Sequence, residues 1–518
     1  MNTIKTKQQP IVWTISGSDC SGGAGIAADI KTGHGLGVEV CHLITANTVQ
    51  NSLTLVSINP VSVELLQAQW QALVKDKPPK VIKIGLLVNA AQVNWLSQAV
   101  SQLKQLSPAL ICVYDPVGQA SVGGALSSLT SQQLAPLLTF IDVITPNLAE
   151  ANVLAQLTNE TNVVKLAKKI QQDFAISSVI IKGGHSTDNA FSTDYCLHQL
   201  AKTEKNQVSP IMRYQLRSTR IASNYSHGGG CCFASAIASF LAHNFLLRDA
   251  FTLAKAFINQ GLSATSQQSS VEQHQYYGAF AAHSWPREYA DFPEIIPQNN
   301  THNKTLGGFS SLELGQKKLG LYPVVDSLNW LERLLPLGLN IIQLRIKDLN
   351  GVALENLIIN AIELAKCYQT RLFINDHWQL AIKHGAYGVH IGQEDLATAD
   401  LLQIQQAGLR LGISTHGCYE FLLAQQLQPS YLAIGAIFPT KTKDMSGQIQ
   451  GIDNLKRLIN LRPKHKAQQI PIVAIGGINL ERAPQVLATT VDSIAVVTAI
   501  TEAEHPEEAV RKLKAMIS

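Results

Sequence analysis

The chain has 518 residues, of which 46% are hydrophobic and 15% are charged, and its formal net charge is +4. This length exceeds what one core normally organises and the apolar content excludes a disordered chain, so we expect two or three globular domains. The net charge is small and is spread along the chain, so the sequence shows no basic patch of the kind that binds nucleic acid or an anionic membrane.

Cysteine use and the N-terminal segment indicate the compartment. The eight cysteines are scattered, with no C-x-x-C pair and no Cys/His spacing typical of zinc. No apolar signal region follows the N-terminus, and no run approaches the roughly 18 apolar residues of a membrane span. We therefore expect a cytoplasmic protein with reduced thiols.

Residues 11–262 alternate short β-branched runs with amphipathic segments. The runs include IVWTISG at 11–17, VIKIGLL at 81–87, LICVYDPV at 110–117 and SVIIKGG at 178–184. This βαβ pattern predicts a mostly parallel sheet covered by helices, with ligands at the carboxyl ends of the strands.

Two glycine-rich turns carry the chemistry expected of this half. GSDCSGGAGIAADIKT at 17–32 places four glycines at a strand-to-helix turn, although a plain tight turn explains it about as well because it lacks the Walker sequence. HGGGC at 227–231 opens a helix whose free N–H groups suit a γ-phosphate. The helix dipole predicts a lowered pKa for Cys231, which suits a general base; the alternative is a buried core cysteine, which we favour for Cys232.

The periodicity fails between about residues 263 and 316, where Gln, Asn, Ser and Pro accumulate. This indicates a domain boundary, in which Phe280, Trp285 and Phe292 predict packing on the first domain and 297–305 reads as free linker. We therefore expect domains at 1–265 and 313–518, separated by a linker and packing extension at 266–312.

Eight buried-strand candidates, each followed by a helical stretch, occupy about 200 residues beyond Leu319. They are LGLYPVVD, NIIQLRIK, RLFIND, GVHIG, RLGIST, YLAIGAI, IPIVAIGG and SIAVVTAI. This count and length predict a (β/α)₈ barrel whose active face lies at the carboxyl ends of the strands.

Polar residues follow these strands in a pattern that predicts a metal-diphosphate site. Gln343, Arg345 and Lys347 alternate at one strand end, where two cations are costly without an anion; snorkelled surface charges are the alternative. Asn375 and Asp376 end the next strand, and Asp395 follows another, so the carboxylates could share one Mg²⁺. For a phosphomonoester we expect the loop with Thr440, Thr442 and Lys443, together with backbone N–H groups of Gly477, Val497 and Thr498.

Seven motifs of the first half resemble hydroxymethylpyrimidine and phosphomethylpyrimidine kinases, which have a ribokinase-like α/β sandwich. Besides the two glycine turns they are TANTVQNS at 45–52, KIGLL at 83–87, DPV at 115–117, TPNLAEA at 145–151 and IKGGH at 181–185. The resemblance implies Cys231 as the catalytic base and a pyrimidine pocket of Gly17, Asp29 and Gln50. It also implies an ATP and Mg²⁺ site of Asp115, Asn147, Glu150, Lys182, Gly228 and Gly230.

The barrel half is similar to thiamine-phosphate synthases through LYPVVD, QLRIKD, FINDHWQLAIKHGAYGVHIGQEDL, GISTH, FPTKTK, IGGI and VVTAI. The resemblance implies that Tyr322 packs near the pyrimidine ring and that Asp376 and Asp395 bind Mg²⁺. The residues implied for the pyrimidine diphosphate are Gln343, Arg345, Lys347, Asn375, His390, Ser414 and Lys443. Those implied for the thiazole phosphate are Thr440, Thr442, Gly477, Val497 and Thr498.

Some residues depart from the families' patterns. Gly229 replaces a common Thr, residues 223–226 lack a usual Lys, Gly118 and Leu86 replace larger or different apolar residues, and His377 replaces an Asp or an aromatic residue. Two alternatives therefore remain for the first half: a pyrimidine-binding module without kinase activity, and a vitamin B6 kinase. The expected partners are small molecules, namely an aminopyrimidine, thiazole phosphate and ATP, and a homo-oligomer through the kinase domain stays open.

Overall fold

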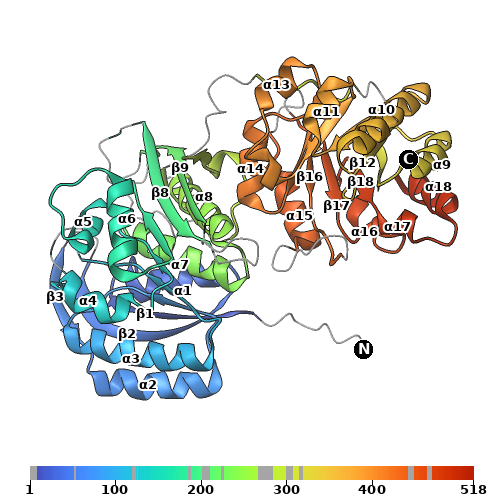
Figure 1. Cartoon of the computed structure of the whole chain (residues 1–518). Helices are drawn as coiled ribbons and strands as arrows, with labels where there is room; N and C mark the ends of the chain where they lie inside the picture. The colour runs from blue at the N-terminus through green and yellow to red at the C-terminus, as the bar shows by residue number, and fades with distance from the viewer. Residues whose placement is uncertain are drawn as a thin grey trace, which may run out of the picture. The chain divides into compact units, whose positions relative to one another are not determined.

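The computed structural model describes residues 9–51, 54–118, 124, 126–184, 188, 190–200, 210–222, 227–266, 284–298, 307–313, 319–440, 449–463 and 469–517. The chain divides into two compact units, Met1–Asn299 and Asn300–Ser518 (Figure 1). Within the described ranges, no helix is long and apolar enough to cross a bilayer. Each cysteine is free, and Cys20 and Cys367 are the exposed ones.

The first unit is a ten-stranded sheet, as far as its described residues extend, in the order β10-β9-β8-β7-β6-β5-β4-β1-β2-β3. Strands β2, β1, β4, β5, β6 and β7 pair in parallel, and antiparallel strands flank them on both edges. The strands are β1 (Ile11–Asp19), β2 (Glu39–Gln50), β3 (Leu55–Pro60), β4 (Val81–Ile84), β5 (Ile111–Tyr114), β6 (Val143–Ile144), β7 (Ser178–Ile181), β8 (Phe191–Gln199), β9 (Ile211–Thr219) and β10 (Glu294–Pro297). The ribokinase-like α/β sandwich is thereby confirmed.

Helices cover both faces of this sheet (Figure 1). They are α1 (Gly25–Gly35), α2 (Val63–Asp76), α3 (Ala90–Leu106), α4 (Ser131–Leu138), α5 (Leu148–Ala155), α6 (Val163–Phe174), α7 (Gly229–Ala242) and α8 (Leu247–Ser266). Helices α2 to α6 share one large core with the sheet, in which Trp70 lies edge-on to both Trp13 and Trp95. The opposite face is covered by α1 and α7, which bury Ala28, Cys231 and Cys232 together.

The second unit is a closed barrel of eight parallel strands, β11 to β18 in sequence order, which confirms the predicted (β/α)₈ fold in the part of the chain that the structure describes. The strands are β11 (Gly320–Val325), β12 (Ile341–Leu344), β13 (Arg371–Asn375), β14 (Gly388–Ile391), β15 (Arg410–Thr415), β16 (Tyr431–Ile434), β17 (Ile472–Ile475) and β18 (Ser493–Val496). The helices are α9 (Leu328–Leu334), α10 (Gly351–Cys367), α11 (Trp378–Lys383), α12 (Gln393–Leu396), α13 (Leu401–Gln406), α14 (Cys418–Gln426), α15 (Gly451–Asn460), α16 (Ala483–Leu487), α17 (Thr498–Thr501) and α18 (Pro506–Ile517).

Large aromatic side chains fill the barrel interior. The rings of Tyr322, Phe373 and Tyr431 pack against one another with centroids 5.1 to 6.3 Å apart. Gly412 makes room for this packing, because a Cβ atom there would lie 2.2 Å from the ring of Tyr431. The glycine is thus required by the neighbouring strand and not by a turn.

The segment expected as a linker is divided between the two units. Trp285 packs edge-on against Phe240, with ring centroids 4.9 Å apart, and β10 pairs with β9 of the first sheet. Phe280 lies outside the described residues. Residues 307–313 instead belong to the barrel, where Leu312 joins the interior core and Arg371 donates to the Leu312 carbonyl at 2.8 Å.

Candidate active sites

Asp19 holds the first glycine turn, directly after β1. Its carboxylate accepts hydrogen bonds from the backbone N–H groups of Ser21, Gly23 and Ala24 at 2.9 to 3.1 Å, and Nε2 of His227 lies 3.2 Å away. Although burial acts to raise it, these hydrogen bonds hold the pKa of Asp19 well below its usual range. Asp19 was not predicted from the sequence as a site residue. The Gly-Ser-Asp sequence that precedes the glycine run is the local pattern that could have identified it.

The two glycine turns touch through their backbones. A Cβ atom on Gly228 would lie 1.9 Å from the Gly23 carbonyl oxygen, and one on Gly25 would lie 2.1 Å from that of Gly17. Gly25 and Gly228 also have φ of 57° and 74°, which favours glycine. The structure therefore brings the two predicted turns together into one site.

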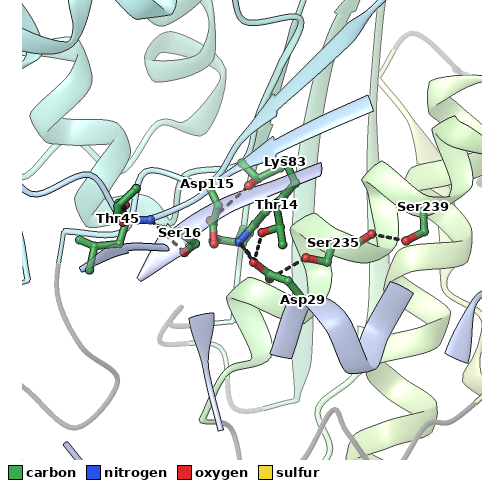
Figure 2. A network of polar contacts seen from close by, with 11 residues as sticks. Thr14, Ser16, Asp29, Thr45, Lys83, Asp115, Ser235 and Ser239 are labelled. Atoms are coloured by element: carbon green, nitrogen blue, oxygen red, sulfur yellow. Dashed lines mark hydrogen bonds and ion pairs between the residues drawn. The ribbon is translucent and has the colours of Figure 1, made fainter. Parts of the chain in front are cut away.

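Asp29, in α1, lies in a buried polar network with Thr14, Lys83 and Ser235 (Figure 2). Lys83 donates to both of its carboxylate oxygens at 2.9 and 3.0 Å, and Thr14 and Ser235 donate at 2.5 and 2.6 Å. The Asp29 and Lys83 side chains are 2% and 0% exposed. Protein donors thus engage both oxygens of Asp29, and its pairing with Lys83 is a contact that the sequence did not predict.

An anion site forms where α7 begins. Lys182 donates to Oδ1 of Asp115 at 2.7 Å, and Thr145 donates to the same oxygen at 3.2 Å. A Cβ atom on Gly230 would lie 3.3 Å from the Lys182 ammonium and 3.7 Å from Oδ2 of Asp115. That Oδ2 is buried and accepts no hydrogen bond from any described residue. A helix N-terminus, a cation and an unpaired carboxylate oxygen are the groups that a phosphate with a divalent cation requires.

Asn147 and Glu150 lie beside this anion site but are engaged in capping α5. Asn147 accepts from the Glu150 N–H at 2.9 Å, and Glu150 accepts from the Asn147 N–H at 2.8 Å. Burial raises the pKa of Glu150. Lys182 acts to lower this pKa and Asp115 acts to raise it, because both charged groups lie near the Glu150 carboxylate. The two residues thus shape the cation's surroundings through the helix cap.

Cys231, at the start of α7, differs from the expectation of a lowered pKa. Burial raises the pKa of its thiol to about 11, while Lys83 and the Gly25 N–H act in the opposite direction. Desolvation thus outweighs the two lowering effects, because Cys231 is only 9% exposed. Gln50, at the end of β2, is equally buried, and its side-chain oxygen has no hydrogen-bond partner among the described residues.

The barrel mouth gathers the predicted diphosphate residues only in part. Gln343 is buried inside the barrel and donates to Tyr322 at 3.3 Å, whereas Lys347 is exposed. Arg345 is partly buried and lies near both Asp376 and His390: it opposes the rise that burial causes in the pKa of Asp376, and it adds to the fall that burial causes in the pKa of His390. Tyr322 is 1% exposed and belongs to the core of the barrel.

Two carboxylates meet at the mouth. After burial, repulsion by Asp395 is the main cause that raises the pKa of Asp376. Asp376 has φ of 62° and accepts a hydrogen bond from Asn375. No cluster of three or more His, Cys, Asp or Glu side chains occurs within the described segments. Two carboxylates that repel each other suit Mg²⁺, which completes its coordination with water and substrate phosphates.

His390 lies between two hydroxyl groups. Its Nδ1 is 2.7 Å from the Tyr431 hydroxyl and its Nε2 is 2.8 Å from the Ser414 hydroxyl. Burial, with Arg345 and His416 nearby, lowers the pKa of His390 to about 3. The imidazole is therefore neutral at physiological pH.

The predicted phosphate loops lie after β16, β17 and β18. Gly477 has φ of 64° and packs against the Pro439 carbonyl, while Thr498 begins α17 with Val497 preceding it. Thr440 is described, but Thr442 and Lys443 lie outside the described residues. Arg482, which sequence reasoning missed, donates to the Gly477 carbonyl at 2.8 Å and stabilises this turn.

Comparison with known proteins gives the same division of the chain. A family model described as phosphomethylpyrimidine kinase matches residues 19–276, and one described as thiamine monophosphate synthase matches residues 321–500. A thiamine-phosphate synthase from Yersinia pseudotuberculosis serotype O:1b is 57% identical over 210 residues, which are 40% of this chain and 94% of the relative.

Two solved structures resemble the chain. Pyridoxal kinase from Staphylococcus aureus with ADP is 26% identical with a TM-score of 0.46, covering 56% of this chain and 100% of that one. Phosphomethylpyrimidine kinase from Clostridium difficile 630 is 25% identical with a TM-score of 0.38, covering 48% and 98%.

Fold and sites define a two-domain transferase with a kinase half and a (β/α)₈-barrel half. Given the matches, the chain belongs to the phosphomethylpyrimidine kinase family through its first unit and to the thiamine-phosphate synthase family through its second. Both halves are enzymes of thiamine biosynthesis.

Proposed function

We propose that the first unit phosphorylates the aminopyrimidine alcohol and then its phosphate with ATP, and that the second unit joins the resulting diphosphate to thiazole phosphate. The main support for this proposal is that Asp115, Lys182 and the N-terminus of α7 lie close together, next to Cys231. These groups supply what phosphoryl transfer needs, namely positioning and charge neutralisation.

The pyrimidine pocket lies between Gly17, Gln50 and Cys231 in this proposal. The orphaned side-chain oxygen of Gln50 supports it, because a buried amide oxygen without a donor is costly and the exocyclic amino group of the pyrimidine is such a donor. Asp29 acts below this pocket by neutralising Lys83. The hydroxymethyl group faces Cys231, whose thiolate takes its proton as the phosphoryl group arrives, and Lys83 stabilises that thiolate.

ATP phosphates bind at Gly228, Gly230 and Lys182, where the α7 amides and the ammonium neutralise negative charge. Oδ2 of Asp115 is the oxygen that fits a Mg²⁺ ion, with Glu150 and Asn147 close by through the α5 cap. When bound, Mg²⁺ supplies charge neutralisation for the transferring phosphate.

In the barrel, Asp376 and Asp395 fit a second Mg²⁺, which neutralises the leaving diphosphate when bound. Arg345, Lys347, Asn375 and Lys443 bind that diphosphate. Gln343, His390 and Ser414 contact the pyrimidine and its diphosphate. The residues proposed for the thiazole phosphate are Thr440, Thr442, Gly477, Val497 and Thr498.

The joining reaction needs little covalent help from the protein. The bond between the pyrimidine methylene and the diphosphate oxygen breaks, the diphosphate takes the electron pair, and the thiazole nitrogen forms the new C–N bond. The cationic side chains at the mouth stabilise the departing charge. We place these reactions in the cytoplasm, on small-molecule substrates.

The test is to supply purified protein with hydroxymethylpyrimidine, MgATP and thiazole phosphate, and in parallel with the pyrimidine diphosphate and thiazole phosphate. Thiamine phosphate is expected from both mixtures. Product from the diphosphate alone would reduce the first unit to a pyrimidine-binding module. Preferential ATP turnover with pyridoxal would make it a vitamin B6 kinase.

A further inference from the structure

Five side chains form a continuous line of polar contacts through the interior of the barrel. Gln343 donates to the Tyr322 hydroxyl at 3.3 Å, and the Tyr322 and Tyr431 hydroxyls are 2.7 Å apart. Tyr431 then reaches Nδ1 of His390 at 2.7 Å, and Nε2 of His390 reaches Ser414 at 2.8 Å. We call these residues, Gln343, Tyr322, Tyr431, His390 and Ser414, the interior relay.

The relay is shielded from solvent except at its last member. Tyr431 and Tyr322 are 0% and 1% exposed, and Gln343 and His390 are 4% and 6% exposed, whereas Ser414 is partly exposed near the end of β15. The buried polar groups of the relay therefore need hydrogen-bond partners within the relay, because a buried hydroxyl without a partner is costly in free energy. Gly412 permits the arrangement by leaving space for the Tyr431 ring between strands.

The amide of Gln343 gives the relay a direction. Its side-chain nitrogen only donates, so the Tyr322 oxygen accepts from it and the Tyr322 proton is free to point to Tyr431. Tyr431 then donates to Nδ1 of His390. The neutral imidazole carries its single proton on Nε2 and donates it to Ser414, whose own proton is left to point out of the relay.

We propose that Tyr322 and Tyr431 are positioning residues that fix the Nε2–H tautomer of His390 and thereby aim the Ser414 hydroxyl proton at the barrel mouth. This inference rests on the proposed synthase function. The Ser414 proton then pairs with an acceptor atom there: a ring nitrogen of the aminopyrimidine or an oxygen of its diphosphate.

The first test is the tautomer itself, observed in the full chain labelled with ¹⁵N-histidine. Long-range ¹H–¹⁵N correlation spectra distinguish the two tautomers, and loss of the signal in H390N assigns it. The expected result is an unprotonated Nδ1 in the native chain and a shift toward the other tautomer in Tyr431→Phe. A proton on Nδ1 of the native His390, or an unchanged signal in Tyr431→Phe, overturns the proposal.

The second test is synthase kinetics with the pyrimidine diphosphate and thiazole phosphate supplied directly. Tyr431→Phe is expected to lower kcat by about 3- to 10-fold, the loss of one neutral hydrogen bond, with KM for thiazole phosphate unchanged. Tyr322→Phe, one link further away, is expected to have a smaller effect. Tyr387→Phe is the matched control, because that hydroxyl donates to the Leu312 carbonyl outside the relay, at 2.7 Å.

A double variant separates positioning from packing. If Tyr431 acts through Ser414, then S414A/Y431F loses no more activity than Ser414→Ala, since the orienting contact has nothing left to orient. Losses that multiply overturn the proposal, as does a Tyr431→Phe enzyme equal to the Tyr387→Phe control. A native chain without synthase activity would defeat the proposed function, and the tautomer measurement would still decide the relay.

Discussion

The Lys83 ammonium lies 2.9 and 3.0 Å from the two carboxylate oxygens of Asp29, with both side chains buried between α1, α7 and the sheet. Although burial acts to lower it, the pKa of Lys83 is raised, because Asp29 attracts the charged form. This pair joins β4 to α1, and Ser235 extends it to α7, the helix that carries Cys231 (Figure 2).

We expect Asp29→Ala to destabilise the first unit by about 3 to 5 kcal/mol, because it leaves a buried ammonium without its counter-charge. Chemical unfolding of the full chain, followed by tryptophan fluorescence, measures the loss. The control is Glu39→Ala, which breaks the partly exposed ion pair with Lys77 and should cost far less. Equal losses in the two variants would show that the buried pair has no special role in stability.

The rate of the kinase half should rise with pH from 7 to 9. The pKa of the Cys231 thiol is about 11, so the thiolate fraction grows roughly tenfold per pH unit below that value. We expect Cys231→Ser to lose about 100-fold or more in kcat, as for removal of a general base, and Cys232→Ala to keep the native profile. A profile that is flat from pH 7 to 9 would mean that substrate binding lowers the thiol pKa or that another group takes the proton.

Replacing Asp395 by Asn should weaken Mg²⁺ binding at the barrel mouth of the synthase. The variant removes one carboxylate and the repulsion that raises the pKa of Asp376, so that pKa falls. We expect the Mg²⁺ concentration for half-maximal activity to rise by about tenfold or more, and chelation by EDTA to abolish native activity. Asp348→Asn, an exposed substitution, is the control; unchanged Mg²⁺ dependence in D395N would remove Asp395 from the site.

Gly229→Thr restores the residue that related kinases usually carry in the second glycine turn. A Cβ atom at Gly229 would meet nothing within 4 Å, so the substitution should fold normally. The added hydroxyl supplies one hydrogen bond to a phosphate, and we expect KM for ATP to fall by about 3- to 10-fold. Gly228→Thr is the contrast, since its side chain would collide with the Gly23 carbonyl. An unchanged KM for ATP in G229T would show that residue 229 does not face the phosphates.

Much of the architecture could be predicted from the sequence because both units repeat the βα alternation. All eight barrel strands lie within the runs predicted for them, from LGLYPVVD to SIAVVTAI. The antiparallel strands β3, β8, β9 and β10 were not predicted. Their side chains are only partly apolar, and β10 follows a stretch rich in Gln and Pro, so tertiary pairing decided their structure.

The sites were predicted less completely, for electrostatic reasons. Sequence position placed Cys231 at a helix N-terminus, but it could not show that burial raises the pKa of its thiol. In the same way, the family resemblance implied a pyrimidine contact for Asp29, but nothing in the sequence indicated its partner Lys83, which is 54 positions away. Tyr431 acts through contacts with Tyr322 and His390, which are 109 and 41 positions away and which no local motif reveals.

The seven residues at 307–313 decide where the barrel begins in the chain. Gln298 still hydrogen-bonds to Arg213 of the first sheet, and Gly307 already contacts Gln405 of the barrel. The last described residue bound to the first unit and the first one bound to the barrel are therefore Gln298 and Gly307. Since Leu312 is part of the barrel core, a barrel expressed alone should need residues 307–313 for full stability.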